Sequence, residues 1–168
     1  IEISIIIPVH NQLEFTHACL ASVQQNSGDI PYQVIVVDDA STDATRDVIG
    51  VIPGVTYLRA ETNSGFIASC NRGAEAAHGR YLVFLNNDTT VTKDWLAALH
   101  ETFEFEPGAG LVGSKLIYPD GRLQEAGGII WRDGSGWNRG KFQDSNKPEY
   151  NYMRQVSYCS AASVMIPK

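Results

Sequence analysis

Cysteine is scarce in this sequence, and so are long apolar segments. Cys19, Cys70 and Cys159 are odd in number and far apart, which argues against a disulfide framework and favours reduced thiols packed inside a cytosolic protein. No apolar run approaches the roughly 20 residues that a membrane-spanning helix needs, and no signal-peptide pattern comes before the first apolar run. We therefore expect a soluble, cytoplasmic chain without a transmembrane segment, and peripheral association at the inner face of a membrane is left open.

Positive charge is the second shortage. The chain has 13 lysine and arginine residues against 19 aspartate and glutamate residues, a formal net charge of -6 and no basic run. Nucleic acids and anionic membranes attract proteins through clustered basic residues. The composition therefore gives no basis for nucleic-acid binding and favours a small-molecule or uncharged partner.

Apolar residues are plentiful enough for a core. With 168 residues, of which 43% are hydrophobic, the chain has the size of one globular domain that folds without disulfides or a structural metal. It begins at Ile1 without a methionine and ends at Lys168 just after an apolar run, so we expect a piece cut from a longer protein. We predict a single domain over residues 1–168, truncated at its C-terminus, with residues 1–90 and 91–168 as its two halves.

Four segments predict β-strands. Residues 3–9, 32–39 and 81–85 are apolar throughout, and residues 55–60 form a weaker run. Strands without polar alternation are typical of a parallel sheet that is covered on both faces. These segments therefore indicate an α/β layer fold.

Helical patterns lie between these strands. Two segments show the i, i+3, i+7, i+10 spacing of one helix face, as Leu13, Thr16, Leu20 and Val23 and as Ile67, Cys70, Ala74 and Ala77. A short helix is expected within residues 43–50, with Ser41 or Thr42 as its N-cap. A fourth helix is expected over residues 93–104.

The second half has a different texture. From Gly108 onwards glycines recur and the helical periodicity ends. Residues 110–124 predict an antiparallel pair of short strands with a turn at residues 119–121. Residues 133–152 are polar and aromatic, and we expect a mobile segment there.

Polar residues follow each apolar run, at residues 8–11, 38–43, 63–66 and 86–88. Ligands of open parallel sheets bind beyond the carboxyl ends of the strands, so these groups are expected to converge on one crevice. The first strand is not followed by a glycine-rich phosphate-binding turn, and the chain has no Walker motif. A nucleotide at this edge would therefore need a divalent metal to neutralise its phosphates.

Asp38 and Asp39 alone leave three interpretations open. An acidic pair at a strand end also occurs in phospho-acceptor receiver domains, although no convincing signature lysine follows a later strand here. In the plainest interpretation, one carboxylate caps the next helix and the other is solvated. In the third, the pair belongs to a ligand site that the other strand ends complete.

Four segments carry a family pattern, namely SIIIPVHN, VIVVDDASTDAT, NSGFIASCNRGAEAAHGRYLVFLNNDTTV and GLVGSKLIYPDGRLQEAG. Together they resemble the family 2 glycosyltransferases of the A-type fold, in the bacterial branch that carries Asn-Asn-Asp. The resemblance covers almost the whole chain. It implies a Rossmann-like α/β fold with a mostly parallel mixed sheet flanked by helices, a nucleotide-sugar-binding first half and a loop-rich antiparallel acceptor-side half.

The resemblance also implies roles for residues at the strand ends. Pro8, His10 and Asn11 fall in the nucleoside pocket, where His10 stands in place of the commoner tyrosine. Asp39 is similar to the carboxylate that accepts a hydrogen bond from the base, and Asp38 supports the same pocket. The segment that reaches back towards the nucleotide and donor sugar contributes four further residues, Asn63, Gly65, Asn71 and Arg72.

The stretch Asn86-Asn87-Asp88 takes the position of the metal-binding DxD motif of that family. By this correspondence Asp88 ligates the Mn²⁺ or Mg²⁺ that holds the donor diphosphate. Asn86 replaces the first acidic residue, so the site is less anionic than a full DxD motif. Asn86 is expected to accept from the ribose or a metal-bound water, and Asn87 to shape the turn beside the nucleotide.

The function implied by the resemblance is inverting transfer of a sugar from a UDP, GDP or dTDP donor to a glycan or lipid-linked acceptor, in the synthesis of cell-surface polysaccharide. The resemblance places the catalytic base beyond Lys168, after the strand-like run CSAASVMIPK. Glu125 is a weak substitute, because a lone glutamate in a polar loop is usually solvated. The alternative function is a truncated or degenerate domain that binds a sugar nucleotide without turnover.

The aromatic residues of the second half have two interpretations. Isolated aromatics either stack on an acceptor sugar or, more often, close a small core, and this applies to Trp131, Trp137, Tyr150 and Tyr152. Three histidines lack metal-ligand spacing and are expected on ordinary helix faces, namely His17, His78 and His100.

Overall fold

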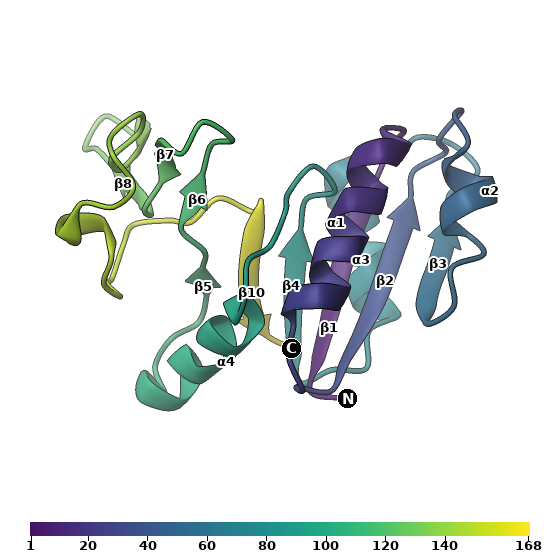
Figure 1. Ribbon diagram of the computed structural model, residues 1–168, viewed down its shortest axis with the longest axis horizontal. Coiled ribbons are helices and arrows are strands. Elements are labelled where there is room, and N and C mark those ends of the chain that lie inside the picture. Colours follow the sequence, from purple (N-terminus) through teal and green to yellow (C-terminus); the bar gives the residue numbers. More distant parts are fainter.

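The main sheet has six strands. The computed structural model describes residues 1–168, and the strands of this sheet are β1 (Ile3–Val9), β2 (Tyr32–Asp38), β3 (Val55–Arg59), β4 (Tyr81–Leu85), β5 (Val112–Gly113) and β10 (Ser163–Pro167). Their order is β3-β2-β1-β4-β10-β5. Strands β1 to β4 pair in parallel, and β10 runs antiparallel to both of its neighbours. The predicted mostly parallel mixed sheet is therefore confirmed (Figure 1).

Four helices connect successive strands of this sheet. They are α1 (Leu13–Asn26), α2 (Thr45–Ile49), α3 (Phe66–Glu75) and α4 (Trp95–Phe105), so each expected helix is present. None of them combines the length and the apolar content that crossing a bilayer would require.

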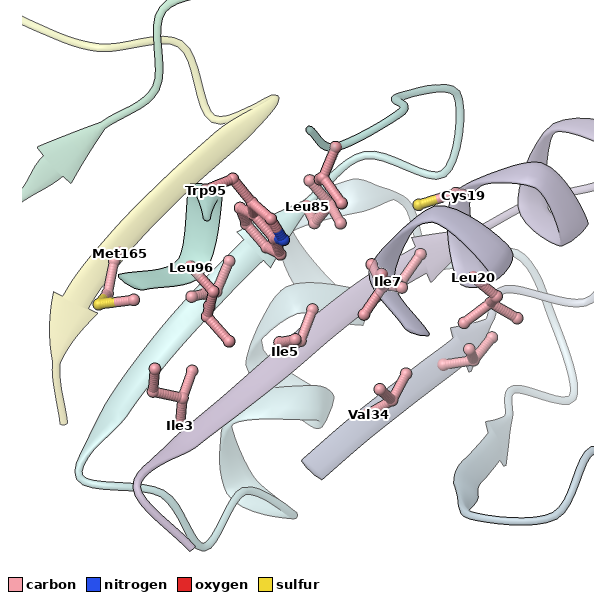
Figure 2. Packing of buried hydrophobic residues seen from close by; sticks show 14 of the residues in the cluster. Ile3, Ile5, Ile7, Cys19, Leu20, Val34, Leu85, Trp95, Leu96 and Met165 are labelled. Carbon is pink, nitrogen blue, oxygen red and sulfur yellow. The ribbon is translucent and has the colours of Figure 1, made fainter. Parts of the chain in front are cut away.

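The isoleucines of β1 show why its sequence is apolar throughout. Ile3, Ile5 and Ile7 pack on one face of the sheet with side chains from α1, α4 and β10 (Figure 2). Ile6 points to the opposite face, where it packs with Ile35, Val37 and Ala77 next to α3. Both faces of the sheet are therefore buried, as the sequence pattern predicts for a parallel sheet.

The buried face of α3 is close to the one expected, because Ala77 lies in the core and Ala74 packs against it, but the start of the expected stripe differs. Ile67 was predicted to lie in the buried stripe but is 76% exposed, whereas Ser69 and Gly73 are buried. A Cβ atom on Gly73 would lie only 2.4 Å from Cγ2 of Ile6. The sheet thus approaches the helix backbone at Gly73, and this close approach decides which face is buried.

The start of α2 also differs from the prediction. Its N-cap residue is Ala44, which has no capping side chain, and Oδ1 of Asp43 accepts from the backbone N–H of Thr45 at 3.0 Å. Ser41 does not cap this helix, because its Oγ accepts from the backbone N–H of Asn11 at 2.7 Å. The predicted N-cap was wrong because this hydroxyl takes part in a tertiary contact.

The second half adds two small antiparallel sheets, which Figure 1 shows at the end of the molecule away from α2 and β3. One consists of β6 (Leu116–Ile117) and β7 (Leu123–Glu125), and the other of β8 (Gly128–Ile130) and β9 (Gly136–Asn138); a 3-10 turn follows at Pro148–Tyr150. The predicted antiparallel pair is confirmed, with Gly121 in its turn at φ 84°. The start of the same segment instead joins the main sheet as β5.

Candidate functional site

The carboxyl ends of β1, β2 and β4 lie at one edge of the sheet because these strands are parallel neighbours. Strand β1 pairs with β2 along its whole length, but its pairing with β4 ends at Ile6 and Phe84. Pro8 follows two residues later and has no N–H to continue the ladder. Its side chain is buried in β1, so Pro8 shapes the strand end and presents little surface to a ligand.

Left-handed backbone conformations occur at both loops that follow β1 and β2. Asn11, Gln12 and Ala40 have φ of 60°, 64° and 58°, a region that is costly for residues with a Cβ. Oδ1 of Asn11 accepts from the backbone N–H of Thr42 at 2.7 Å and from that of Asp43 at 3.3 Å. Asn11 therefore locks the two loops together and offsets the local strain.

Asp39 anchors a third loop at the same edge. Its carboxylate accepts from the backbone N–H of Ser64 at 2.8 Å, from Oγ of Ser64 at 2.9 Å and from the backbone N–H of Gly65 at 2.7 Å. Burial disfavours the charged form, yet these hydrogen bonds outweigh it and lower the pKa of Asp39. Because Asp39 is only 4% exposed, much of its acceptor capacity already serves the chain itself.

His10 is exposed beside this anchor. Its Nδ1 lies 2.8 Å from the carbonyl oxygen of Asp39, which can only accept, so Nδ1 carries the proton and donates. Nε2 is then the acceptor, and the side-chain nitrogen of Asn11 lies 3.4 Å from it. The side-chain nitrogen of Asn63 is 3.3 Å from Nδ1. The structure thus brings His10, Asn11, Asp39 and Asn63 together, as the sequence predicted.

Asp38 is fully buried and connects the end of β2 to the adjacent strand β3 through side-chain hydrogen bonds. Its carboxylate accepts from the backbone N–H of Ser41 at 2.8 Å, from the Tyr57 hydroxyl and from Nη1 of Arg59. Burial opposes ionisation, but these donors more than offset it and lower the pKa of Asp38. Burial and the bond to Asp38 raise the pKa of Tyr57 to about 12. The interpretation of Asp38 and Asp39 as one capping and one solvated carboxylate was therefore wrong.

The Asn86-Asn87-Asp88 stretch is tied to α1 and β10. The backbone N–H of Asn86 donates to the Ala162 carbonyl at 2.9 Å. The side-chain nitrogen of Asn87 donates to Oγ1 of Thr16 at 3.0 Å, and that hydroxyl donates to the Gln12 carbonyl at 3.2 Å. Asn87 therefore shapes the turn and connects it to the loop that follows β1.

Asp88 is the exposed member of this stretch, and its carboxylate forms no salt bridge. Its charge contributes to the raised pKa of Cys19, about 11, which is due mainly to burial of that thiol. No three His, Cys, Asp or Glu side chains are grouped as a complete metal site. One free carboxylate next to an amide fits a divalent ion that takes its other ligands from water and a bound diphosphate.

Asn71 and Arg72 lie further along α3, and no hydrogen bond joins their side chains to the loops that follow β1, β2 and β4. Asn71 is exposed. Nη1 of Arg72 is buried and has no hydrogen-bond partner, which leaves an N–H donor of a permanently charged group unused.

Glu125 is buried, contrary to the expectation of a solvated side chain. It is 1% exposed and lies in β7, where its Oε1 accepts from the backbone N–H of Ser160 at 2.8 Å. The prediction of a solvated loop residue was wrong, because the strand turns this side chain inwards.

The two tryptophans beyond α4 do not close a core. Trp131 and Trp137 form an edge-to-face pair with ring centroids 5.7 Å apart, and they are 48% and 63% exposed. Tyr152 is 59% exposed, whereas Tyr150 packs under the guanidinium of Arg139 at 5.0 Å. A small-core role therefore fits only Tyr150, and the tryptophan pair offers its ring faces to solvent.

Sequence analysis missed the groups that hold the predicted site residues in place. Tyr57, Arg59, Ser64 and Thr16 all donate to or accept from a site residue. One signal was available for Arg59: Asp38 and Arg59 end adjacent parallel strands and are partners in register. Aligning the ends of neighbouring strands would have paired them.

Known proteins match this chain in sequence. The sequence profile described as Glycosyl transferase family 2 matches residues 4–166. The putative teichuronic acid biosynthesis glycosyltransferase TuaG of Bacillus subtilis is 33% identical over 126 residues, which cover 71% of this chain and 49% of TuaG.

Solved structures show the same architecture. The crystal structure of S. aureus TarS 1-349 is 25% identical with a TM-score of 0.64, and covers 73% of this chain and 37% of that one. The mannosyltransferase PcManGT of Pyrobaculum calidifontis shares the fold, with 23% identity, a TM-score of 0.63 and coverage of 71% and 36%. This chain thus spans less than half the length of each of these proteins. The match along nearly the whole sequence shows that the chain belongs to glycosyl transferase family 2, with the A-type glycosyltransferase fold.

Proposed function

We propose that residues 1–90 form the donor site of an inverting, metal-dependent glycosyltransferase, and that residues 91–168 contribute to the acceptor side. The donor is a sugar linked to a nucleoside diphosphate, and the acceptor is a glycan or lipid-linked glycan in cell-surface polysaccharide synthesis. The observation that carries the proposal is the unpaired, exposed carboxylate of Asp88, on a turn fixed by Asn87. It follows β4 at the edge where the loops after β1 and β2 are locked together.

Similar proteins support the proposal of a nucleotide-sugar donor and of a role in polysaccharide synthesis. TarS was crystallised in complex with UDP-GlcNAc and in complex with UDP, and TuaG is named for teichuronic acid biosynthesis. PcManGT, which shares only the fold at 23% identity, was solved with GDP-Man and Mn²⁺. The choice among UDP, GDP and dTDP is left to experiment.

In the proposed mechanism the chain binds and orients the donor. A hydroxyl of the acceptor attacks the anomeric carbon while the bond to the diphosphate oxygen breaks, and a base takes the hydroxyl proton. A divalent ion supplies charge neutralisation for the departing diphosphate. Asp88 and the side-chain oxygen of Asn86 are the groups that would hold that ion, and Mn²⁺ and Mg²⁺ both accept such oxygen ligands. We assign no base within residues 1–168.

The nucleoside is proposed to lie on the group of neighbouring side chains formed by His10, Asn11, Asp39 and Asn63. The remaining acceptor capacity of the Asp39 carboxylate faces a base N–H, and Pro8 and Asp38 support the surrounding loops. Gly65 lets its loop dock on Asp39 through its own N–H at 2.7 Å. Asn71 and Arg72 would serve the donor sugar or diphosphate, since Nη1 of Arg72 lacks a partner in the chain.

Calorimetric titration with UDP, GDP and dTDP, each with and without Mn²⁺, tests the donor site. We expect one nucleotide to bind in the presence of the metal, and Asp88→Ala to weaken that binding by about tenfold or more, as expected for loss of a charged contact. Asp29→Ala is the matched control, because Asp29 is also exposed and precedes β2 at the opposite edge of the sheet. Binding of no nucleotide, or binding that ignores both the metal and Asp88→Ala, would remove the donor-site assignment.

A transfer assay separates the enzyme from a domain that only binds a sugar nucleotide. The assay compares residues 1–168 with a longer form of the protein, using the nucleotide sugar identified by calorimetry. Turnover by either form supports the transferase. Tight donor binding without hydrolysis or transfer by both forms would favour the binding-only alternative.

A further inference from the structure

The buried carboxylate of Glu125 is not explained by the donor site. Glu125 is the only buried acidic residue in the second half of the chain. Its Oε1 accepts from the backbone N–H of Ser160 at 2.8 Å, while Oε2 is buried and has no hydrogen-bond partner in the chain. Carboxylates are rarely buried so completely, because desolvation of the charge is costly. The position of Glu125 therefore calls for a function that compensates for this cost.

The segment that Glu125 holds leads directly to the proposed metal turn. Oγ of Ser160 accepts from the backbone N–H of Ala162 at 3.3 Å. The carbonyl of Ala162 then accepts from the backbone N–H of Asn86 at 2.9 Å. Strand β10 begins at the next residue, Ser163, which is paired with Leu85 at the end of β4. Three hydrogen bonds and one short turn thus connect Glu125 to Asn86.

Other contacts leave this turn little freedom to move on its own. A Cβ atom on Gly113 would lie 2.4 Å from Cβ of Cys159, so β5 packs tightly against the start of the turn. The backbone N–H of Ser114 donates to the carbonyl of Ser163 at 3.0 Å, and the hydroxyls of these two serines are 2.7 Å apart. The turn is clamped at both ends, and Glu125 supplies the one side-chain acceptor for the N–H of Ser160 between them.

We infer that Glu125 is a positioning residue for the donor metal site, acting through the turn at residues 159–162 on Asn86 and hence on Asp88. This inference rests on the proposed function of Asp88. A role as catalytic base fits poorly, because a side chain that is 1% exposed cannot reach an acceptor hydroxyl without a rearrangement of β7. Positioning needs only the acceptor oxygen, whereas a base needs the titratable carboxylate. The two roles therefore respond differently to an isosteric amide.

Backbone amide hydrogen exchange, followed residue by residue by NMR, tests the positioning role without any ligand. We expect Glu125→Ala to speed exchange at Ser160 and Asn86 by about tenfold or more, because the side-chain acceptor of the Ser160 N–H is lost. Glu125→Gln keeps an acceptor oxygen and should stay within about threefold of the wild-type rates. Leu123→Ala is the control for general loss of stability, since Leu123 is fully buried in the same strand but does not contact the turn through a hydrogen bond.

Unchanged exchange at Asn86 in Glu125→Ala, or an equal change in Leu123→Ala, would overturn the inference. If Glu125→Ala does not fold, Glu125→Gln decides the question alone: retained protection of Asn86 supports positioning through the acceptor oxygen, and loss of protection overturns it. These outcomes do not depend on whether the chain binds a nucleotide.

Titration of Mn²⁺ with UDP, GDP and dTDP then connects positioning to the donor site. In the wild-type chain Mn²⁺ should strengthen binding of one of these nucleotides; Glu125→Ala should reduce that strengthening, and Glu125→Gln should retain it. Full strengthening in Glu125→Ala, with binding still lost in Asp88→Ala, would contradict the inference and leave the proposed function intact. No nucleotide binding by the wild-type chain would instead remove the proposed function, while the exchange result would still report whether Glu125 fixes Asn86.

Discussion

The two halves of the chain each contain an aspartate paired with an arginine, in opposite surroundings. Asp38 and Arg59 join the ends of β2 and β3, and the side chain of Asp38 is 0% exposed. Asp120 and Arg122 lie two residues apart in the turn between β6 and β7, 2.7 Å from each other, with side chains 49% and 55% exposed. The same chemical pair thus joins two strands in one half and lies on the surface of a single turn in the other. Burial and strand register, more than the residue types, therefore set how much such a pair contributes to the free energy of unfolding.

The contrast extends to the aromatic and apolar residues. In the first half, the helices cover both faces of the sheet, and Ile3, Ile5, Ile6 and Ile7 are fully buried. In the second half, the hairpin of β8 and β9 leaves Trp137 largely exposed. We therefore expect substitutions at buried positions of the first half to act on stability, and substitutions of the exposed tryptophans of the second half to act on ligands.

Removing the buried carboxylate of Asp38 should have the largest effect. Asp38→Ala takes away the acceptor for three donors, and it should lower the free energy of unfolding by about 3 kcal/mol. Urea denaturation measures this change. Asp120→Ala is the matched control and should give no resolvable change. Equal effects of the two substitutions would mean that burial does not distinguish the pairs.

The close packing of α3 on the sheet provides the next test. Gly73→Ala places a methyl group 2.4 Å from Cγ2 of Ile6, and overpacking of this kind should cost about 2 kcal/mol in unfolding free energy. A Cβ atom on Gly110, in the second half, meets no atom within 4 Å. Gly110→Ala should therefore be close to neutral in the same urea experiment. A neutral Gly73→Ala would show that α3 shifts away from the sheet at little cost.

Acid should weaken the first half by a smaller, graded amount. The pKa values of Asp38 and Asp39 are lowered from 3.8 in the folded chain, so the unfolded chain binds more protons between the folded and unfolded pKa values. The stability from these carboxylates is fully present above the unfolded pKa and is lost as the pH falls through the folded pKa. Urea denaturation from pH 6 to pH 2.5 measures the loss.

The variant Asp39→Asn isolates one of these carboxylates. It should flatten the acid limb of the stability curve, because one titrating group with a lowered pKa is gone. An acid limb as steep as that of the wild-type chain would assign the pH dependence to other carboxylates.

The exposed tryptophan pair should show the smallest effect on stability. Trp137→Ala removes a ring that is 63% exposed and should change the unfolding free energy by no more than about 0.5 kcal/mol. If the pair stacks on an acceptor sugar, the same substitution should raise KM for the acceptor and leave donor binding unchanged. A large loss of stability would indicate that the pair supports the fold after all.

The strand ends were the most predictable part of the site. Unbroken apolar runs revealed the parallel sheet, and the polar residues after them, such as His10, Asp39 and Asp88, could be placed at one edge from the topology alone. The partners of Asp38 were missed: Arg59 could have been paired with it from the aligned strand ends, whereas the contact of Tyr57 depends on how its side chain packs. Ile67 of α3 was placed wrongly for a related reason: a hydrophobic pattern cannot reveal that the sheet packs directly against the backbone of Gly73.

The segment between α4 and β10 was harder because its strands, β5 to β9, are two or three residues long, too short to carry a periodic signal. Glu125 shows the consequence. One side chain in a three-residue strand has an equal prospect of pointing inwards or outwards, and only the pairing of β7 with β6 turns it towards Ser160.

By itself, the sequence determined the alternation of strands and helices, the parallel order of the first half and the edge at which the proposed ligand site lies. Those properties follow from local periodicity and from the direction of the strands. Only the tertiary structure decided which polar groups are already engaged, as in Asp38 and Asp39, and which are free, as in Asp88. Hydrogen-bond partners from distant segments settle that difference, and their positions depend on the packing of the whole chain.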